Sequence, residues 1–439
     1  MNNLNGEKTG KDFIPKKFLF VSFESLSGDL AWKLKNEGHE IKVYVKSERD
    51  RDVYEGFLEK VEKWEDHKDW ADVIVFDDVG FGEIADSLRK EGKLIVGGSE
   101  YTDKLEEDRE FGQNEMKRTG MFILPHWDFV DFDSAIDFIK SNPGRYVFKP
   151  SGTVPSDMKG ILFLGQEEDG KDLIEILEQN KKAWAKKIKR FQIQKLAVGV
   201  EIAVGAFFNG EDFVYPINVN FEHKKLFPGD IGPYTGEMGT LMYWSDPNTI
   251  FNTTLFKMKE ELKKSGYVGY VDLNCIANSK GIYPLEFTCR FGYPTISIQM
   301  EGIVSEMGDF LYTIAKKEKF ELKTKKDFQI GVVVVVPPWP YEDKSQTFIY
   351  KDLSILFKKP NLDGIRLGDV KLINGTWCVA GDTGYVLVVT GSGSTVEEAR
   401  KQVYNRIKNI MLQNMYYRTD IGLKWNQDSD RLQTWGYLK

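Results

Sequence analysis

The sequence predicts a multidomain protein of mixed α/β and α+β class that begins with a small parallel α/β domain at residues 1–101. A central domain is expected at 102–326, and an α+β domain with an extended tail at 327–439. Strands and glycine-terminated helices alternate in the first part, β-hairpin patterns fill the second, and a long apolar strand opens the third. The 439 residues, 41% of them hydrophobic, are enough to bury two or three cores.

The N-terminal region alternates short apolar strands with helices. The expected strands are KFLFVSF, EIKVYVK, DVIVFD and KLIVGG. Helices are expected at 29–36 and 84–90, ended by Gly38 and Gly92. This pattern is typical of a parallel sheet, in which ligands lie at the carboxyl ends of the strands. The segments after two of these strands, 22–28 and 77–82, are therefore a possible binding site.

The first part of the central domain contains a charged helix and two short strands. The helix is expected at 102–120, and the strands at 146–150 and 191–196. Lys149 is the one cation in the apolar YVFKP strand. Its ammonium group therefore either reaches the surface or faces a phosphate.

A hairpin follows, with the sequence AVGVEIAVGAFFNGEDFVYPI and its turn at Asn209 and Gly210. Glu201 lies inside an apolar strand of this hairpin, where a carboxylate is costly unless it is paired or exposed. The charged run EHKK and a glycine-rich segment at 229–239 come next. Such a segment either is a mobile surface loop or lets backbone amides approach a ligand closely, and we favour the second interpretation.

Residues 266–294 predict another hairpin, with strands at 267–276 and 282–287 and a turn at 278–281. Asp272 and Glu286 lie on its two strands, close enough to face one divalent cation. The alternative is a half-exposed hairpin whose charges lie on its solvated face. The polar exit TCRFGYP is poor core material and favours a site.

The C-terminal region opens with the buried strand FQIGVVVVV and closes with a strand, a turn and a helix from Thr395. Thr395 and Glu398 form a predicted capping box. Apolar residues follow at helical spacing and predict core packing: Val396, Ala399, Val403, Ile407 and Ile410. The tail at 424–439 contains two tryptophans and is expected to pack on the body of the protein or on a partner.

Composition excludes several other classes of protein. The three cysteines are far apart and the four histidines have no ligand spacing, so neither a disulfide framework nor a zinc site is expected. A net charge of -7 argues against nucleic-acid binding. No apolar run approaches a membrane span, and the polar opening MNNLNGEKTGKDF lacks the apolar segment of a signal peptide. We therefore expect a soluble, cytoplasmic protein without membrane or nucleic-acid partners.

Three separated motifs are PLEFTCRFGYP at 284–294, FEHKKLFPGDIGPYTGEMG at 221–239 and YYRTDIG at 416–422. Together they resemble one enzyme family, glycinamide ribonucleotide synthetase (phosphoribosylamine-glycine ligase), in the ATP-grasp superfamily. The matching family motifs are the metal-binding LEFNxRFGDPE, then DHKRLxxGDxGPNTGGMG, and the C-terminal YRxDIG. Weaker similarity joins them from about residue 18 to 422. The resemblance implies that 102–326 is an ATP-grasp domain with a mobile subdomain at about 121–196.

The resemblance also implies residues that bind ATP. LEEDREF resembles the family's LEGSKAF, which places Arg109 where a nucleotide-contacting lysine is expected, and YVFKPSG resembles VIKADG, which places Lys149 on the phosphates. The loop at 152–160, including Lys159, would close over the triphosphate. Backbone groups of Lys195 and Leu196 would hold the adenine, and Glu201 the ribose.

A metal and substrate set is implied in the same way. Mg²⁺ or Mn²⁺ would be held by Asp272 and Glu286, with Thr288 in place of the family's asparagine. Lys149 and Arg290 would be the catalytic cations, and Arg290 would also steer the carboxylate substrate. The remaining residues expected to bind substrate are Glu222, His223, Lys224, Asp230, Thr235 and Gly236.

The segment SFESLSGDL departs from the glycine-rich, basic loop with which the family would bind the acceptor's phosphate. It has one glycine, no cation, and two carboxylates, Glu24 and Asp29, and it is alternatively only a helix cap. The predicted function is an ATP-dependent carboxylate-amine ligase that acts through an acyl phosphate. The alternatives are an ATP-grasp ligase outside purine synthesis and a nucleotide-binding pseudoenzyme. The sequence indicates neither the oligomeric state nor the true acid and amine.

Overall fold

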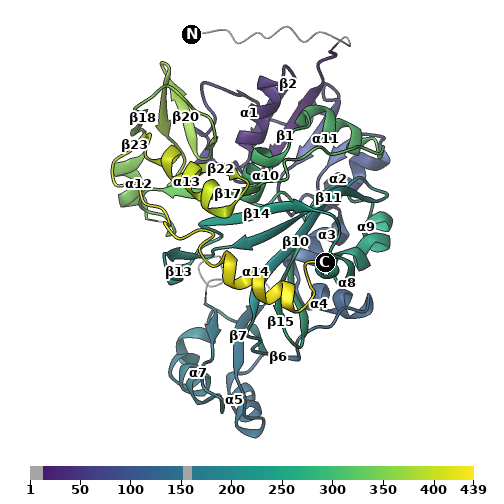
Figure 1. The fold of residues 1–439 in the computed structure, drawn as a ribbon, viewed down its shortest axis with the longest axis vertical. Helices are drawn as coiled ribbons and strands as arrows, with labels where there is room; N and C mark the ends of the chain where they lie inside the picture. Colours follow the sequence, from purple (N-terminus) through teal and green to yellow (C-terminus); the bar gives the residue numbers. More distant parts are fainter. Residues whose placement is uncertain (1–12, 152–160, 342) are drawn as a thin grey trace.

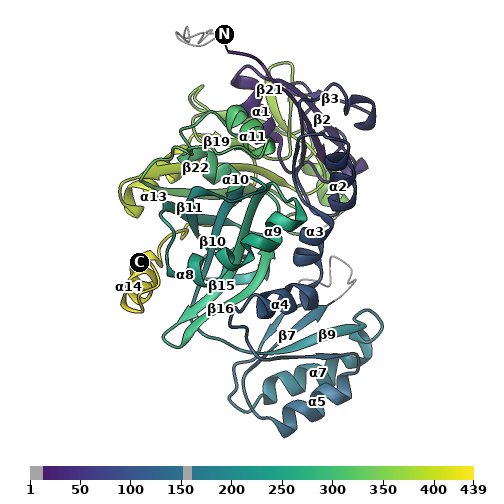
Figure 2. The ribbon, with the colours of Figure 1, turned by 90° about the vertical axis from the view of Figure 1, so that its right-hand side faces the viewer.

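The computed structural model describes residues 13–151, 161–341 and 343–439. A small lobe projects from one end of a larger body in both views (Figures 1 and 2). Lys159 lies outside the described residues, so its expected contact with the triphosphate stays a prediction. No helix in the described ranges is long and apolar enough to cross a membrane.

The N-terminal sheet is parallel, as predicted, with strand order β3-β2-β1-β4-β5. Its strands are β1 (Lys17–Ser22), β2 (Glu40–Val45), β3 (Glu59–Lys60), β4 (Val73–Phe76) and β5 (Ile95–Val96). Its helices are α1 (Gly28–Asn36) and α2 (Gly82–Lys90), with single 3-10 turns at η1 (Glu48–Asp50) and η2 (Glu65–His67). The segments at 22–28 and 77–82 follow the neighbouring strands β1 and β4, so they meet at the carboxyl edge of the sheet.

The prediction of a single helix at 102–120 is wrong, because the chain forms two helices there. They are α3 (Glu100–Glu107) and α4 (Arg109–Arg118). Asp108 adopts an extended backbone between them, and its side chain accepts a hydrogen bond from the Phe111 N–H. An aspartate that caps a new helix competes with continuation of the old one. The break places Arg109 at the first position of α4.

The small lobe has an antiparallel sheet with strand order β6-β9-β7-β8, covered by two helices (Figure 2). These elements are β6 (His126–Phe129), α5 (Phe132–Ser141), β7 (Tyr146–Ser151), β8 (Phe163–Leu164), α7 (Lys171–Trp184) and β9 (Arg190–Lys195). The predicted strands at 146–150 and 191–196 are confirmed. The lobe has its own aromatic core around Phe132, Phe148 and Phe191.

The body is built on an antiparallel sheet with strand order β16-β15-β10-β11-β14-β17-β22-β19. Its strands are β10 (Val200–Phe208), β11 (Phe213–Glu222), β14 (Gly239–Ser245), β15 (Gly269–Asn278), β16 (Gly281–Thr288), β17 (Phe328–Val335), β19 (Ile365–Leu367) and β22 (Tyr385–Gly393). Both predicted hairpins, β10-β11 and β15-β16, are confirmed. Strand β17, which opens the expected C-terminal domain, pairs with β14 and so continues the central sheet. The domain boundary expected at 327 therefore does not divide this sheet, and it stays a proposal.

Shorter elements surround this sheet. They are β12 (Lys225–Phe227), β13 (Ile231–Tyr234), α8 (Thr249–Thr253), η3 (Leu255–Met258), α9 (Lys259–Ser265), α10 (Thr295–Gly302) and α11 (Met307–Ala315). Helix α10 directly follows the predicted polar exit from β16. All of its residues are buried, since it contacts β17, β22 and β14 as well as α1. The N-terminal sheet and the body are therefore packed together through this helix.

The C-terminal region adds a sheet with strand order β20-β21-β18-β23, next to the long sheet. Its elements are α12 (Lys344–Tyr350), β18 (Ser354–Phe357), β20 (Val370–Ile373), β21 (Thr376–Val379), α13 (Val396–Ile407), β23 (Ile410–Met411) and α14 (Trp425–Thr434). Thr395 caps α13 as predicted, and the Glu398 carboxylate accepts hydrogen bonds from Ser394 as well as from the Thr395 backbone. Ile410 is buried in β23, beyond the end of the helix. The tail packs on the body (Figure 1), with Trp425 against aromatic rings of β11, β14 and β17.

Candidate active site

Two adjoining cavities lie between the small lobe and the body. The lobe cavity has a volume of about 550 Å³ and lies against β7 and β9. The carboxylate cavity has a volume of about 530 Å³ and lies against β15, β16 and the start of α4. The residues that line both are Arg109, Pro150, Lys224, Gly236, Leu285 and Glu286. A ligand that occupies one cavity can thus extend directly into the other.

The lobe cavity combines apolar walls with the half-buried Lys149. Apolar side chains come from both lobes, namely Leu124, Val147, Leu162, Leu164, Leu196, Ile276, Leu285 and Trp339. Lys149 donates a hydrogen bond from Nζ to Oε1 of Gln194 at 2.7 Å. Burial, reinforced by the nearby positive charge of Arg109, lowers the pKa of Lys149 to about 8. An anion in this cavity would favour the charged lysine.

The backbone N–H groups of Lys195 and Leu196, at the end of β9, already have hydrogen-bond partners. The N–H of Lys195 donates to the carbonyl of Pro125 at 2.9 Å, and the N–H of Leu196 donates to that of Arg145 at 3.0 Å. The ammonium group of Lys195 lies over the Tyr146 ring, 4.1 Å from its centroid. Both N–H groups are therefore already used within the lobe, so any adenine contact at these residues would have to involve their carbonyl oxygens.

Lys224 joins the two cavities through carboxylates on three strands. Its Nζ lies 3.1 Å from Glu201 on β10, 3.4 Å from Glu222 on β11 and 3.6 Å from Glu286 on β16. Burial alone would lower the pKa of Lys224, but these carboxylates raise it well above its usual value. Lys224 in turn lowers the pKa of Glu286 to about 2, together with Arg109 at 3.9 Å and Lys149. Glu201 is thus paired, which explains a carboxylate inside this apolar strand.

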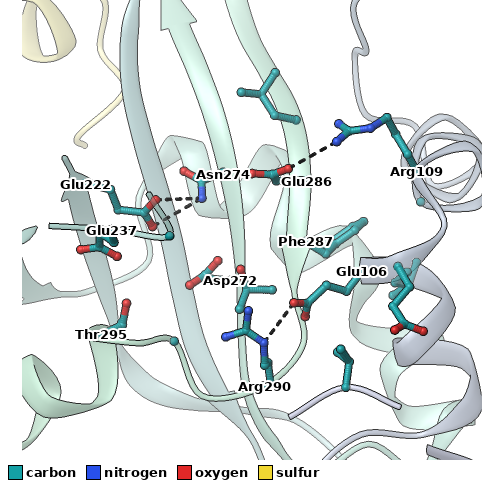
Figure 3. Close-up of a pocket in the computed structure, with 18 of the residues that line it drawn as sticks. Glu106, Arg109, Glu222, Glu237, Asp272, Asn274, Glu286, Phe287, Arg290 and Thr295 are labelled. Carbon is teal, nitrogen blue, oxygen red and sulfur yellow. Dashed lines mark hydrogen bonds and ion pairs between the residues drawn. The ribbon is translucent and has the colours of Figure 1, made fainter. Parts of the chain in front are cut away.

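Figure 3 shows the carboxylate cavity, into which Asp272 projects from β15. Asp272 lies directly opposite Thr288 in the strand register, and Asn274 lies opposite Glu286. The expected metal pair is therefore a diagonal pair. Burial, and then the charge of Glu222, raises the pKa of Asp272 to about 8, and its Oδ1 atom has no hydrogen-bond partner.

Two carboxylates and a hydroxyl suit a hard cation such as Mg²⁺. The unpartnered Oδ1 of Asp272 also favours a cation at this place. Within the described ranges, however, no cluster of three or more His, Cys, Asp or Glu side chains could hold a metal ion. A cation held by Asp272, Glu286 and Thr288 would therefore need further ligands besides these three residues.

Arg290 is engaged by the protein itself (Figure 3). Its Nε lies 3.1 Å from Glu106 on α3 and 3.1 Å from Asp78, and Nη1 donates to the Phe291 carbonyl at 3.0 Å. Burial opposes the charge, but Glu106 and Asp78 raise the pKa of Arg290 above its usual value. A substrate carboxylate at this guanidinium would have to share it with two protein carboxylates.

The other residues expected to bind substrate divide into two groups. Gly236 lines both cavities, and Thr235 lines the lobe cavity while its hydroxyl donates to the Lys224 carbonyl at 2.9 Å. His223 is buried away from both cavities, and burial together with Arg418 lowers its pKa to about 4. Asp230 pairs with Arg418 at 2.9 Å and with Lys424, also away from the cavities. These pairs hold the β12-β13 hairpin against the C-terminal segment.

The carboxylate cavity also contains polar residues that were not expected from the sequence, among them Glu106, Glu237 and Asn274. Asn274 could have been found by strand alternation, since it lies two residues after Asp272 and therefore on the same face. Glu237 occupies a glycine position of the family motif, in GEMG instead of GGMG. Nothing in the sequence around Glu106 distinguishes it from the other acids of a charged helix.

This chain is similar to known proteins both in sequence and in fold. Residues 107–296 match the family model for the ATP-grasp (A) domain of phosphoribosylglycinamide synthetase, and 329–424 match that for its C domain. Phosphoribosylamine-glycine ligase of Streptococcus pneumoniae is 26% identical over 79% of this chain and 82% of its own. The Neisseria meningitidis serogroup B ligase is 26% identical over 93% of this chain and 99% of its own.

Among solved structures, phosphoribosylamine-glycine ligase from Thermotoga maritima has a TM-score of 0.68 at 22% identity, covering 92% of this chain and 100% of its own. N5-carboxyaminoimidazole synthetase from Staphylococcus aureus, complexed with ADP, has a TM-score of 0.57 at 12% identity, covering 90% and 97%. The fold, with its paired cavities between a small lobe and a long antiparallel sheet, defines an ATP-grasp protein. Within that class, the chain belongs to the phosphoribosylglycinamide synthetase family.

Proposed function

We propose that this protein is an ATP-dependent carboxylate-amine ligase that forms a C–N bond through an acyl phosphate. The observation that carries the proposal is the convergence of Arg109, Lys149 and Lys224 where the lobe cavity meets the carboxylate cavity. ATP carries about four negative charges, and phosphoryl transfer depends mainly on positioning and charge neutralisation. Its named relatives are ligases of this kind.

The reaction divides between the two cavities. The base of ATP would occupy the lobe cavity, with Glu201 near the ribose and Lys149 and Arg109 at the phosphates. An oxygen of the substrate carboxylate attacks the γ-phosphorus, the bond to the β-phosphate oxygen breaks, and ADP leaves. The amine nitrogen then attacks the acyl carbon, loses a proton, and displaces inorganic phosphate. A Mg²⁺ ion on Asp272, Glu286 and Thr288 would neutralise charge on the transferring phosphoryl group.

We further propose that the amine acceptor lacks a phosphomonoester, because the hydrogen-bond donors of the loop before α1 are already used within the protein. The Gly28 N–H at the start of the helix donates to the Tyr54 hydroxyl at 3.0 Å, and a Cβ on Gly28 would overlap the Tyr54 ring. The Ser27 hydroxyl donates to Asp77 at 2.6 Å, and the Ser25 hydroxyl donates to Asp369 at 3.4 Å. These donors are thus unavailable to a phosphate.

The carboxyl groups around this loop also oppose a phosphate when they are ionised. Asp29, Asp77 and Asp369 are buried there, and burial raises the pKa of each, that of Asp77 to about 7. One ionised carboxylate about 5 Å from a phosphate charge costs on the order of 3 kcal/mol at an effective dielectric constant of about 20. The acid and ATP half of the site would operate, while phosphoribosylamine would be a poor acceptor.

An ADP-release assay tests both parts of the proposal. ATP, Mg²⁺ and a panel of amino acids and amines are supplied, and ADP formation that requires both an acid and an amine supports the ligase. ATP binding without any turnover would identify a pseudoenzyme instead. For the acceptor, glycine is combined with freshly generated phosphoribosylamine or with ribosylamine, the same amine without the phosphate. Efficient formation of glycinamide ribonucleotide would refute the argument from this loop and restore the plain family function.

A further inference from the structure

A further cavity, which we call the basic cleft, lies apart from the two cavities of the candidate active site. It has a volume of about 600 Å³ and is formed by the C-terminal ends of α2 and α9, the first turns of α3 and α4, and the segment after α11. Helices α2, α3 and α9 lie next to one another in both ribbon views (Figures 1 and 2). No described residue lines both the basic cleft and either cavity of the active site.

Positive charge gathers in the basic cleft, although the protein as a whole is acidic. Among the described residues, five cations and two carboxylates line it: Arg89, Lys90, Lys104, Lys264 and Lys317, with Asp86 and Glu100. The lining therefore carries a charge of +3, whereas the whole chain carries -7. Like charges around one hollow repel each other, so this local excess attracts anions.

Two of the five cations are available to a ligand. The other three already form ion pairs: Lys104 with Glu100 at 2.8 Å, Lys264 with Glu261 at 2.8 Å, and Arg89 with Asp86 at 2.9 Å. Lys90 and Lys317 are exposed and form no ion pair within the described ranges. Both lie at helix C-termini, where a cation complements the helix dipole. The dipole explains each lysine singly, but not why three such helix ends converge on one hollow.

Part of the basic cleft is rigid and part is aromatic. Arg89 donates to the carbonyls of Gly97 and Gly98 at 2.7 Å each, and its Nε atom has no partner, so the guanidinium is fixed and can still take an acceptor. Tyr101 and Phe111 are half-buried and lie edge to face, with ring centroids 5.7 Å apart. A ring system can pack on these side chains while its anionic groups reach the lysines.

The helices that line the basic cleft also reach the candidate active site. On α3, Glu106 accepts from the Cys289 N–H at 2.7 Å and lies 3.1 Å from Nε of Arg290. On α4, Arg109 lines both active-site cavities and precedes Phe111 by two residues. A ligand that shifts α3 or α4 from the cleft side therefore moves charges in the active-site cavities.

We propose that the basic cleft is an effector site for a small aromatic compound that carries several phosphate groups. Its anionic groups contact Lys90 and Lys317, and its ring packs on Tyr101 and Phe111. Its binding changes the affinity for ATP through α3 and α4, and by linkage ATP changes the affinity for the effector by the same factor. The site does not depend on which acid and amine the protein uses.

The probe for a direct test is pyrenetetrasulfonate, a fluorescent ring system whose sulfonates stand in for phosphates. It is titrated into the full-length protein with Mg²⁺ and a saturating non-hydrolysable ATP analogue, so that the active site is filled. It should bind ten-fold or more tightly than pyrophosphate, which has charge but no ring, and lose affinity as the salt concentration rises. Lys90→Glu combined with Lys317→Glu changes the charge of the lining from +3 to -1 and should weaken probe binding ten-fold or more. The two glutamine substitutions should weaken it less, and they serve as the test if charge reversal disturbs folding.

Lys359→Glu combined with Lys401→Glu is the matched control, since both lysines are exposed, lie outside the cleft and change the net charge by the same amount. This variant should bind the probe as the wild type does. A saturating probe should change the Kd of the ATP analogue three-fold or more in the wild type and in the control, but not in the Lys90 and Lys317 variant. Absence of probe binding, or equal affinities in the cleft and control variants, would overturn the site. Probe binding that leaves the Kd of the ATP analogue unchanged would overturn the effector role.

Discussion

Lys149 should make ATP binding depend on pH in a way that adenosine binding does not. The pKa of Lys149 in the free protein is about 8, below the usual value for lysine, because the side chain is buried near Arg109. The free protein therefore loses this charge as the pH rises through about 8. Phosphates favour the charged lysine, so ATP must bind together with a proton at higher pH.

The size of the effect follows from that pKa. If only the charged form binds ATP well, the apparent Kd should rise by about 25-fold between pH 7.5 and pH 9.5, approaching ten-fold per pH unit. Calorimetry at both pH values gives the Kd, and buffers of different ionisation enthalpy report the proton taken up. Adenosine carries no phosphate, so its Kd should stay constant.

Two variants separate Lys149 from other titrating groups. Lys149→Met should weaken ATP binding more than adenosine binding and remove the pH dependence. Lys149→Arg keeps a charge that does not titrate in this range, so its ATP affinity should also be flat with pH. A wild-type ATP affinity that is constant from pH 7.5 to 9.5, or the same pH dependence in Lys149→Met, would refute this reasoning. Equal loss of ATP and adenosine in Lys149→Met would contradict the phosphate contact.

Three further predictions concern the metal, the ribose and the buried charges. Asp272→Asn and Glu286→Gln should leave folding nearly intact and strongly impair Mg²⁺-dependent ATP turnover; wild-type rates in both would exclude the metal assignment. Glu201→Gln should weaken ATP and adenosine alike, as measured by calorimetry, and loss of ATP binding alone would exclude a ribose contact. Burial alone would raise the pKa of Glu301, but surrounding cations lower it, so its stabilising effect should be lost as pH falls through that lowered pKa. Glu301→Gln should cost about 3–5 kcal/mol in denaturant unfolding at neutral pH, and an unchanged unfolding midpoint would contradict this pairing.

Local patterns predicted most of the secondary structure but not how the strands assemble. The turn at Asn209 and Gly210 and the cap at Thr395 were recognisable because turn and cap chemistry depends on a few adjacent residues. The break at Asp108 was missed because helix periodicity continues across it, and only the cap reveals it. Sequence could not place β17 beside β14, since that pairing joins strands far apart in the chain.

The candidate site was predictable where a motif identifies residue types, and less so where distant charges meet. Asp272 and Glu286 do face one cavity, but the diagonal register between them depends on how the two strands pair. Arg290 was expected to be available to substrate, yet Asp78, from the segment after β4, and Glu106 already pair with it. Glu237 was not selected because its burial without a partner exists only in the folded chain.

The pairing of β14 with β17 limits how this protein can be divided into fragments in the laboratory. A fragment that ends near residue 326 would leave the whole outer edge of β14 without its neighbour, exposing a row of backbone N–H and C=O groups that invite aggregation. The small lobe, by contrast, closes its own core and has no strand in the long sheet. Residues from about 121 to 196 are therefore the segment to excise or transplant, whereas the matched A and C domains must be expressed together.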